Sequence, residues 1–325
     1  MSATTASGSS SIDNDIAQWV SDAGYGQVKS SSHSGSSDWA SFRKVRFNCV
    51  DLYLYLVSSI SMFSSLYTTV LTYELPCVVV TAGGNKNKTK QKQVEVTNPP
   101  TPETSFFVKV SQRSAKDMFE GEALGLQAMY ECSNAGRNTS DNNNDDKNES
   151  LCIPKVFHWG DSSSSSSGSF LIMEYLVLKG RSNEYALGRA MAKLHLADPT
   201  TVPKAGNPDG KFGFNVDNTI GGTVQPNPWT DNNTTQDWID FYSTHRIQHQ
   251  LQLAGDASLL RMWTNDIAPR LPMLFENLEV KPSLLHGDLW SGNIGSAKNG
   301  IPSIYDPAVY WGHHEAEWGK LKIVL

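Results

Sequence analysis

Cysteine is scarce in this chain, and its four residues stand far apart in the sequence. Cys49, Cys77, Cys132 and Cys152 form no C-x-x-C pair, and none has a histidine at metal-ligand spacing. The sequence therefore predicts neither a disulfide framework nor a cysteine-based zinc site. It favours free thiols in a reducing compartment.

Positive charge is also limited, because 27 Lys+Arg against 33 Asp+Glu give a formal net charge of -6. General nucleic-acid binding needs a basic surface, so we expect no nucleic-acid partner. The N-terminal residues lack a basic stretch followed by an apolar core, so we expect no secretory signal and predict a cytoplasmic protein. The zinc-hydrolase motif H-E-x-x-H is missing, which argues against a metal site at the adjacent His313 and His314.

Charge is absent altogether from Leu52 to Tyr73, over about the length that spans a bilayer. The run is rich in Ser and Thr, and its β-branched and aromatic residues outnumber good helix formers. This composition argues against a membrane-spanning helix, and we expect no membrane partner.

The remaining pattern predicts a β-rich half with one main helix, followed by a helical half. A short helix is expected over 12–23, a strand–turn–strand over 28–45 with its turn at Gly35, Ser36 and Ser37, and a strand over 105–110. A helix over 114–131 and strands over 153–160 and 169–176 follow. The expected helices of the second half are 184–196, 234–254 and 258–278, the last broken near Pro269. The polar segment near 134–150 is predicted to be a disordered loop.

The stretch "LLHGDLWSGNIGSAKNGIPSIYDPAVYWGHHE" places several acceptor groups in one expected strand–loop–strand unit. Asp288 and Asn293 are five positions apart, the spacing of the base and the metal-binding Asn in protein-kinase catalytic loops. The apolar run "PSIY" then leads to Asp306. Mg²⁺ prefers hard oxygen ligands, often one or two carboxylates with phosphates and water. These residues therefore predict phosphoryl transfer to a hydroxyl group, and His286 is expected to orient the loop backbone.

Phosphoryl transfer also needs a lysine for the nucleotide phosphates and a carboxylate that fixes this lysine. Lys109 lies in the middle of the expected strand "FFVKV". The following helix carries Glu120 and Glu122. Taken alone, Lys109 reads as an ordinary solvent-facing lysine, and only the downstream motifs favour a functional role.

These motifs together resemble those of the fructosamine-3-kinase (ketosamine-3-kinase) family, a branch of the aminoglycoside-phosphotransferase-like kinases. The resemblance rests on "FFVKV", "MFEGEALGLQAM", "FLIMEYL", "LGRAMAKLHL", "LLHGDLWSGNIG" and "IYDPAVYWGHHEAEWG" and covers roughly residues 105–319. It implies an α+β, two-lobed protein-kinase-like fold. The expected N-lobe is 12–175, β-rich with one main helix, and the expected helical C-lobe is 176–325.

The resemblance also implies roles for individual residues. Asp288 would be the catalytic base, Asn293 and Asp306 would bind Mg²⁺, and Lys109 would contact the ATP phosphates while paired to Glu122. The turn at Gly35, Ser36 and Ser37 would approach the phosphates, and the hinge at Met173, Glu174 and Tyr175 would meet adenine. Trp290, His313 and Glu315 would shape the ketosamine pocket.

The implied activity is ATP-dependent phosphorylation of the 3-hydroxyl of ketosamines, either small molecules or glycated proteins. The 3-phosphoketosamine product decomposes and frees the amine, so the enzyme would repair glycated lysines. Two alternatives stay open: a kinase of another small hydroxylated metabolite, and a non-catalytic remnant that binds a nucleotide or a partner.

The chain departs from the family pattern in three places. The turn that is glycine-rich in the family matches poorly here, because it contains Asp38 and has no cysteine. The segment near 46–100 lengthens the connection between two expected strands. It could be an inserted membrane or docking element, a real surface extension, or a gene-model error such as a translated intron. We favour the translated intron. After "HHEAEWG" the family continues with further helices, so we expect a truncated C-lobe with exposed apolar surface.

Overall fold

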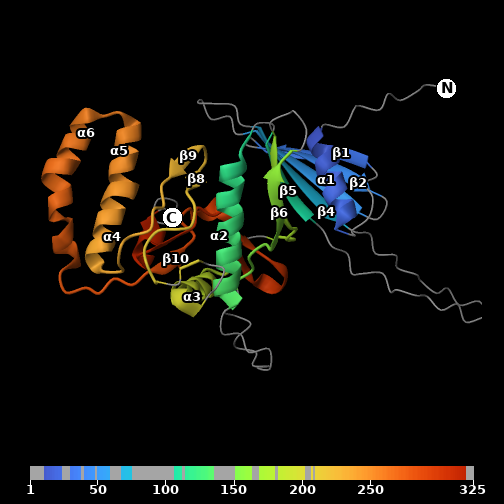
Figure 1. The fold of residues 1–325 in the computed structure, drawn as a ribbon. Coiled ribbons are helices and arrows are strands. Elements are labelled where there is room, and N and C mark those ends of the chain that lie inside the picture. The colour runs from blue at the N-terminus through green and yellow to red at the C-terminus, as the bar shows by residue number, and fades with distance from the viewer. Residues whose placement is uncertain are drawn as a thin grey trace, which may run out of the picture. The chain divides into compact units, whose positions relative to one another are not determined.

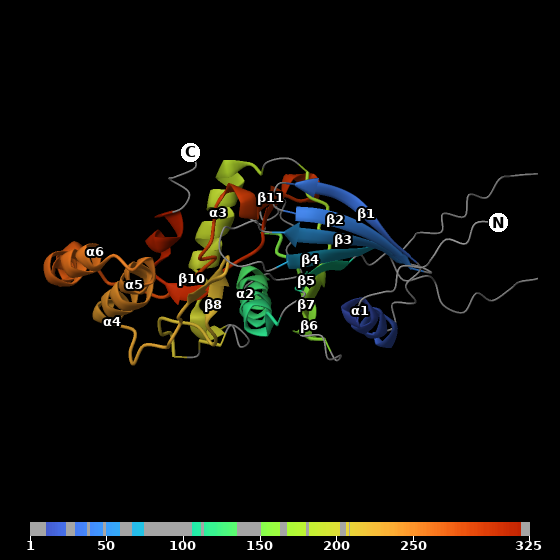
Figure 2. The same ribbon diagram turned by 90° about the horizontal axis from the view of Figure 1, so that it is seen from above.

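The computed structural model describes residues 11–23, 30–37, 40–47, 50–58, 67–74, 106–111, 114–134, 151–162, 168–179, 182–201, 206–207 and 209–319. The chain divides into two compact units (Figures 1 and 2). The first comprises Met1–Ser114 and Asp161–Tyr175, and the second comprises Ala115–Gly160 and Leu176–Leu325. The expected lobe boundaries stay a prediction, and the loop expected near 134–150 lies outside the described residues from position 135 on.

The first unit is built on one antiparallel sheet with the order β1-β2-β3-β4-β5-β7. Its elements are α1 (Ser11–Asp22), β1 (Ser30–Ser37), β2 (Ala40–Phe47), β3 (Val50–Ser58), β4 (Tyr67–Glu74), β5 (Phe106–Ser111) and β7 (Ser169–Glu174). The expected amphipathic helix is confirmed as α1, whose Ile16 and Val20 are fully buried. The ring of Trp19 meets that of Phe106 edge-on at 5.7 Å, so α1 covers the sheet near β5.

The turn was predicted at the wrong position. Gly35, Ser36 and Ser37 are not in a turn but are the last three residues of β1. Ser36 pairs with Ser41 and Ser37 with Ala40, and the register shifts between His33 and Ser36. Small residues can follow an extended backbone, and an irregularity in the register accommodates an extra residue within a strand.

The uncharged run from Leu52 to Tyr73 contributes to two strands of this sheet. β3 and β4 pair with each other, β3 pairs with β2, and β4 pairs with β5 so that Val70 lies opposite Lys109. The described residues contain no helix that combines the length and the apolar character needed to cross a membrane. The origin of the longer segment near 46–100 stays a prediction.

The second unit is mostly helical and carries three two-stranded sheets, β8-β9, β10-β13 and β11-β12. Its helices are α2 (Lys116–Asn134), α3 (Glu184–His195), α4 (Thr235–Phe241), α5 (His249–Ala254) and α6 (Ala257–Met262). Its strands are β8 (Asn218–Ile220), β9 (Thr223–Gln225), β10 (Ser283–Leu285), β11 (Ile294–Ser296), β12 (Pro302–Ile304) and β13 (Tyr310–Gly312), while β6 (Val156–Asp161) leads the chain back to the first unit. Figure 1 shows α5 and α6 side by side.

Local sequence signals explain where the helices begin and end. Asn183 caps α3 by accepting from the backbone of Ala186, and Asp256 caps α6. The expected helix 234–254 is confirmed as a continuous run in which a π-helix (Tyr242–Gln248) joins α4 to α5, and the left-handed Gly255 ends it. The break expected near Pro269 is also found, because a 3-10 helix (Ala268–Phe275) begins there.

Helix α2 packs closely onto the segment that follows Asp306. A Cβ atom on Gly125 would lie 2.9 Å from the Val309 side chain, so only glycine permits this approach. The Asn218 side-chain amide donates to the carbonyl of Val309 at 2.6 Å. The start of β13 is therefore held between α2 and β8.

Aromatic residues fill the core on the other side of this segment. Trp238 is 2% exposed and packs against Phe212 and Phe241, and Trp311 is fully buried. Several large apolar side chains of the helical region are exposed, including Leu253, Met273 and Leu274.

Candidate functional site

The expected strand–loop–strand unit consists of β10, a loop over 286–293, and the β11–β12 hairpin that leads to Asp306. The backbone N–H of Ala308 donates to the carbonyl of His286 at 2.8 Å, and that of Tyr305 donates to the carbonyl of Asn293 at 3.2 Å. The two segments that carry the predicted site residues are therefore tied to each other along their backbones.

Asn293 joins the predicted base to the segment of Asp306. It is 5% exposed, and its side-chain nitrogen lies 2.9 Å from the carbonyl oxygen of Asp288, 3.3 Å from Oδ2 of Asp288 and 3.2 Å from the carbonyl oxygen of Asp306. Asp306 has a φ of 56°, a left-handed backbone that is uncommon for residues other than glycine. Such strain is found at functional sites and needs surrounding contacts to hold it.

His286 orients the loop backbone, as the sequence predicts. Its ring is fully buried, Nε2 lies 2.9 Å from the carbonyl oxygen of Tyr305, and Nδ1 lies 3.3 Å from the backbone nitrogen of Asp288. Nε2 must donate to the carbonyl, and Nδ1 must accept from the N–H, which is the arrangement of a neutral imidazole. Burial lowers the pKa of His286, in agreement with a neutral ring.

Gly287 occupies a position that no other residue fills without strain. Its φ is 76°, and a Cβ atom here would lie 2.0 Å from the carbonyl oxygen of Ala308. The glycine thus lets the loop approach the segment after Asp306.

A buried carboxylate for which the motifs predict no role lies against the same loop. Glu317 is 3% exposed; its Oε2 accepts from the backbone N–H of His286 at 2.6 Å and its Oε1 from that of Gly287 at 3.1 Å. Nε2 of His195, at the end of α3, lies 3.4 Å from Oε2. The only signal in the sequence is that Glu317 is the second acidic residue in "HHEAEWG", and nothing local distinguishes it from the exposed Glu315.

The donor set of this region fits a magnesium ion. Asp288 and Asp306 offer carboxylate oxygens, and the three acceptors around Nδ2 of Asn293 direct its Oδ1 to the opposite side of the amide. Hard oxygen ligands of this kind suit Mg²⁺.

The residues predicted for the substrate pocket also belong to the second unit. Trp290 is 43% exposed, and its ring lies over Gly292, where a Cβ atom would meet it at 2.3 Å. His313 is half-buried, with its ring 6.1 Å from Trp238 and 6.2 Å from Phe275. Burial lowers the pKa of His313, and Glu315 is exposed.

The residues predicted to bind the nucleotide are distributed over both units. Lys109 lies in the centre of β5 opposite Leu171 of β7 and is 9% exposed, so it is not a solvent-facing lysine. Met173 and Glu174 end β7, and Tyr175 follows them. Glu122 lies in α2 of the second unit, and its pairing with Lys109 stays a prediction.

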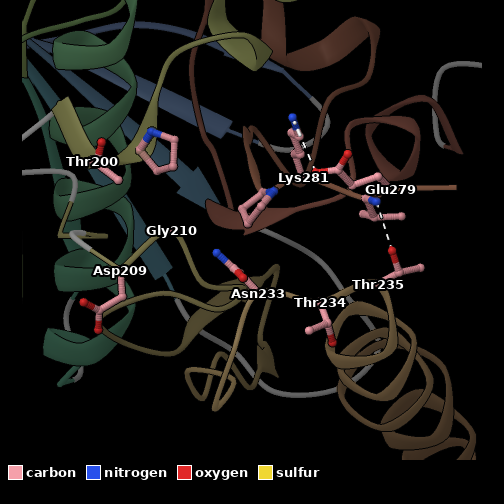
Figure 3. Close-up of a pocket in the computed structure, with 11 residues that line it drawn as sticks. Thr200, Asp209, Gly210, Asn233, Thr234, Thr235, Glu279 and Lys281 are labelled. Carbon is pink, nitrogen blue, oxygen red and sulfur yellow. Dashed lines mark hydrogen bonds and ion pairs between the residues drawn. The ribbon is translucent and has the colours of Figure 1, made fainter.

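A separate cavity of about 520 Å³ lies at the start of β10, whereas His286 and Asp288 follow the end of this strand (Figure 3). Figure 3 shows Asn233 between Asp209 on one side and Lys281 on the other. The cavity contains none of the predicted site residues, and its Lys281 is paired with Glu279 at 3.5 Å.

Comparisons with known proteins agree with this geometry. The family model described as "Fructosamine kinase" matches residues 81–324. A rice protein named protein-ribulosamine 3-kinase, chloroplastic, is 43% identical over 224 residues, which cover 67% of this chain and 56% of that protein. Mouse ketosamine-3-kinase is 33% identical over 270 residues, covering 77% of this chain and 79% of the mouse protein. The chain thus spans little more than half the length of the plant relative.

Solved structures confirm the expected fold class. A crystal structure assigned as a fructosamine-3-kinase from Haemophilus somnus 129PT matches with a TM-score of 0.55 and 22% identity, covering 93% of this chain and 74% of that one. One from Thermobifida fusca YX-ER1 matches with a TM-score of 0.51 and 20% identity, covering 95% and 78%. The chain therefore has the α+β, protein-kinase-like fold that its motifs predict.

Proposed function

Because the chain belongs to the fructosamine kinase family, we propose that it transfers the γ-phosphoryl group of ATP to the 3-hydroxyl of a ketosamine. The observation that carries this proposal is the Asn293 side chain, which bonds both Asp288 and the backbone of Asp306. A base and two oxygen ligands for Mg²⁺ are the groups that this reaction needs in the catalytic loop. The names of the rice and mouse relatives supply the substrate class.

In the proposed mechanism, Asp288 accepts the proton of the 3-hydroxyl as the oxygen attacks the γ-phosphorus. The new O–P bond forms while the bond to the β-phosphate oxygen breaks and ADP leaves. Bound Mg²⁺, held by Asn293 and Asp306, would neutralise charge on the phosphate oxygens. Lys109 would hold the α- and β-phosphates with Glu122 as its partner, and the backbone from Met173 to Tyr175 would bind adenine.

The substrate would be a ketosamine on a small amine or on a protein lysine, contacted by Trp290, His313 and Glu315. Phosphorylation would destabilise the adduct and release the amine, so the biological role would be deglycation of proteins. A cytoplasmic location stays a prediction, and the name of the rice relative places that protein in the chloroplast.

The test is a coupled assay for ADP release with purified protein, Mg-ATP and either ribulosyl-lysine or fructosyl-lysine. We expect turnover with at least one ketosamine and a loss of roughly 100-fold or more in Asp288→Asn, because general-base contributions are about 10²–10⁴-fold. ATP binding without turnover would favour the non-catalytic remnant. Turnover with another polyol but neither ketosamine would favour a kinase of a different metabolite.

A further inference from the structure

Asn218, the first residue of β8, is a buried amide to which the proposed mechanism gives no role. It is 2% exposed, and its Nδ2 donates to the carbonyl of Val309 at 2.6 Å. Among the described residues, its Oδ1 is a buried acceptor that receives no hydrogen bond. Burial of an unpaired polar atom is costly, so stability alone does not explain an amide at this position. What the side chain contributes is its N–H donor to Val309.

The acceptor of this hydrogen bond lies close to a proposed metal ligand. Val309 follows three residues after Asp306, whose left-handed φ of 56° needs surrounding contacts to hold it. The N–H of Ala308 donates to the carbonyl of His286 at 2.8 Å, while the carbonyl of Val309 is held by Asn218. The segment after Asp306 is thus bonded on one side to the loop of the proposed base and on the other side to β8.

Helix α2 contacts both members of this hydrogen bond. Gly121 and Gly125 are four positions apart in α2 and therefore share one face of the helix. A Cβ atom on Gly121 would lie 3.0 Å from the Cβ of Asn218, and one on Gly125 would lie 2.9 Å from the side chain of Val309. Figures 1 and 2 show β8 beside α2. The two bonded residues thus pack together against one glycine face, which leaves their hydrogen bond little freedom to shift.

We propose that Asn218 is a positioning residue, which keeps Asp306 in its left-handed conformation by binding the carbonyl of Val309. This inference rests on the proposed kinase function for its kinetic consequence, but its structural part is independent of activity. If Asp306 binds Mg²⁺, loss of the Asn218 donor must weaken the use of Mg²⁺. The KM for the ketosamine should stay unchanged, because a side chain that is 2% exposed does not reach the substrate. Residues that orient a metal ligand typically affect metal affinity or activity by about 10–100-fold.

The experiment compares the full-length wild type, Asn218→Leu and the control Asn207→Leu. Leucine has nearly the shape of asparagine, so Asn218→Leu removes the donor together with the unpaired Oδ1. Asn207 is also 2% exposed, and its Nδ2 donates to the carbonyl of Lys211 at 2.9 Å within its own loop. We expect Asn218→Leu to raise the half-saturating Mg²⁺ concentration by about 10-fold. Asn207→Leu should lower the melting temperature without this shift.

Hydrogen–deuterium exchange without Mg²⁺ or nucleotide gives a readout that needs no turnover. Exchange in a peptide covering 306–312 should become faster in Asn218→Leu and keep its wild-type rate in Asn207→Leu. Asn218→Asp is a second variant of the same shape, whose carboxylate has no proton to donate to Val309, whereas its protonated form donates an O–H. Because burial favours the protonated form, its activity relative to the wild type should be higher at pH 6 than at pH 8.

Each outcome supports or overturns the role of Asn218. Wild-type exchange and Mg²⁺ dependence in Asn218→Leu would overturn it, and so would an equal Mg²⁺ shift in Asn207→Leu, which would indicate packing alone. If the wild type shows no turnover with ketosamines, the proposed function fails, while the exchange measurement still decides the role of Asn218. If Asn218→Leu unfolds, as seen in its melting curve, Asn218→Asp decides, and a relative activity that does not depend on pH overturns the role.

Discussion

The side-chain amide of Asn293 donates to the backbone carbonyl of Asp306 at 3.2 Å while it also bonds Asp288. One small side chain thus ties together the two segments that carry the proposed base and the proposed metal ligands. Asn293→Asp keeps the side-chain shape but places an oxygen where the structure needs a donor to three acceptors.

We therefore expect Asn293→Asp to lower turnover by roughly 100-fold or more, in the range found when one catalytic hydrogen-bond donor is removed. The Mg²⁺ concentration needed for half-maximal activity should also shift. Steady-state assays at several Mg²⁺ concentrations measure both effects. The matched control is Asn265→Asp, the same chemical change at an exposed position, which should behave as the wild type. Equal activity of the two variants would contradict the proposed role of Asn293.

Arg246 is a half-buried cation that supports the packing around β13. Its guanidinium donates to the carbonyl of Pro226 at 2.7 Å and to Oδ1 of Asn227, and it lies 4.0 Å from the centre of the Tyr310 ring. Lysine cannot reproduce this planar set of donors and stacking contacts. We expect Arg246→Lys to lower the free energy of unfolding by about 2–3 kcal/mol, since one hydrogen bond from a charged group contributes about 1.5–3 kcal/mol.

Urea titrations of the wild type, Arg246→Lys and Arg246→Met measure this effect. Met should be more destabilising than Lys, because it keeps no donor for the carbonyl of Pro226. Arg261→Lys, on the exposed surface of α6, is the control and should leave the midpoint unchanged. If Arg246→Lys unfolds at the same urea concentration as the wild type, the planar arrangement of the guanidinium donors is not needed for stability.

Cys132 should resist alkylation in the folded protein. Burial, followed by the charge of Glu131, raises the pKa of its thiol from 9.0 to about 12. Since only the thiolate reacts, a shift of about 3 pKa units lowers its reactive fraction near neutral pH about 1,000-fold. Iodoacetamide labelling at pH 8 with peptide mapping should therefore modify the half-buried Cys152 before Cys132. Equal labelling of both thiols without denaturant would refute the assignment.

The same thiol makes the stability depend on pH in the alkaline range. The folded state keeps the proton of Cys132 up to about pH 12, whereas the unfolded chain loses it above about pH 9. Deprotonation therefore favours the unfolded state as the pH rises through this window, and the contribution of Cys132 to the free energy of unfolding decreases. Cys132→Ser should remove this part of the pH dependence in urea titrations between pH 8 and 10.

The catalytic loop was predictable from the sequence because its signal is local. Asp288, Asn293 and Asp306 stand at fixed spacings beside apolar runs, and short backbone contacts hold them together. Glu317 meets this loop through a tertiary contact with an amide 31 positions away, so its own sequence neighbours carry no signal. The π-helix after α4 was missed for a related reason, because its apolar pattern is close to that of an ordinary helix.

The strands β3 and β4 form a hairpin that the sheet does not need for its topology. β2 is antiparallel to β3, β3 to β4, and β4 to β5, so β2 and β5 already run in opposite directions. Without the hairpin, β2 and β5 would be neighbours in the sheet. Because they run in opposite directions, they could form an antiparallel pair like the other strands of this sheet. A variant lacking residues 50–100 retains Asn48, Cys49 and residues 101–105 as a connection, which is long enough for a hairpin loop.

We expect this variant to remain folded and to keep the ATP-dependent turnover of the full chain, since Lys109 would stay in a central strand. Circular dichroism, melting curves and the ADP-release assay with ribulosyl-lysine compare the two proteins. A matched deletion of the β1–β2 hairpin, residues 30–47, should abolish turnover if Gly35, Ser36 and Ser37 approach the phosphates. Loss of folding in the 50–100 deletion would show instead that β3 and β4 are integral to the sheet, and would argue against a translated intron as their origin.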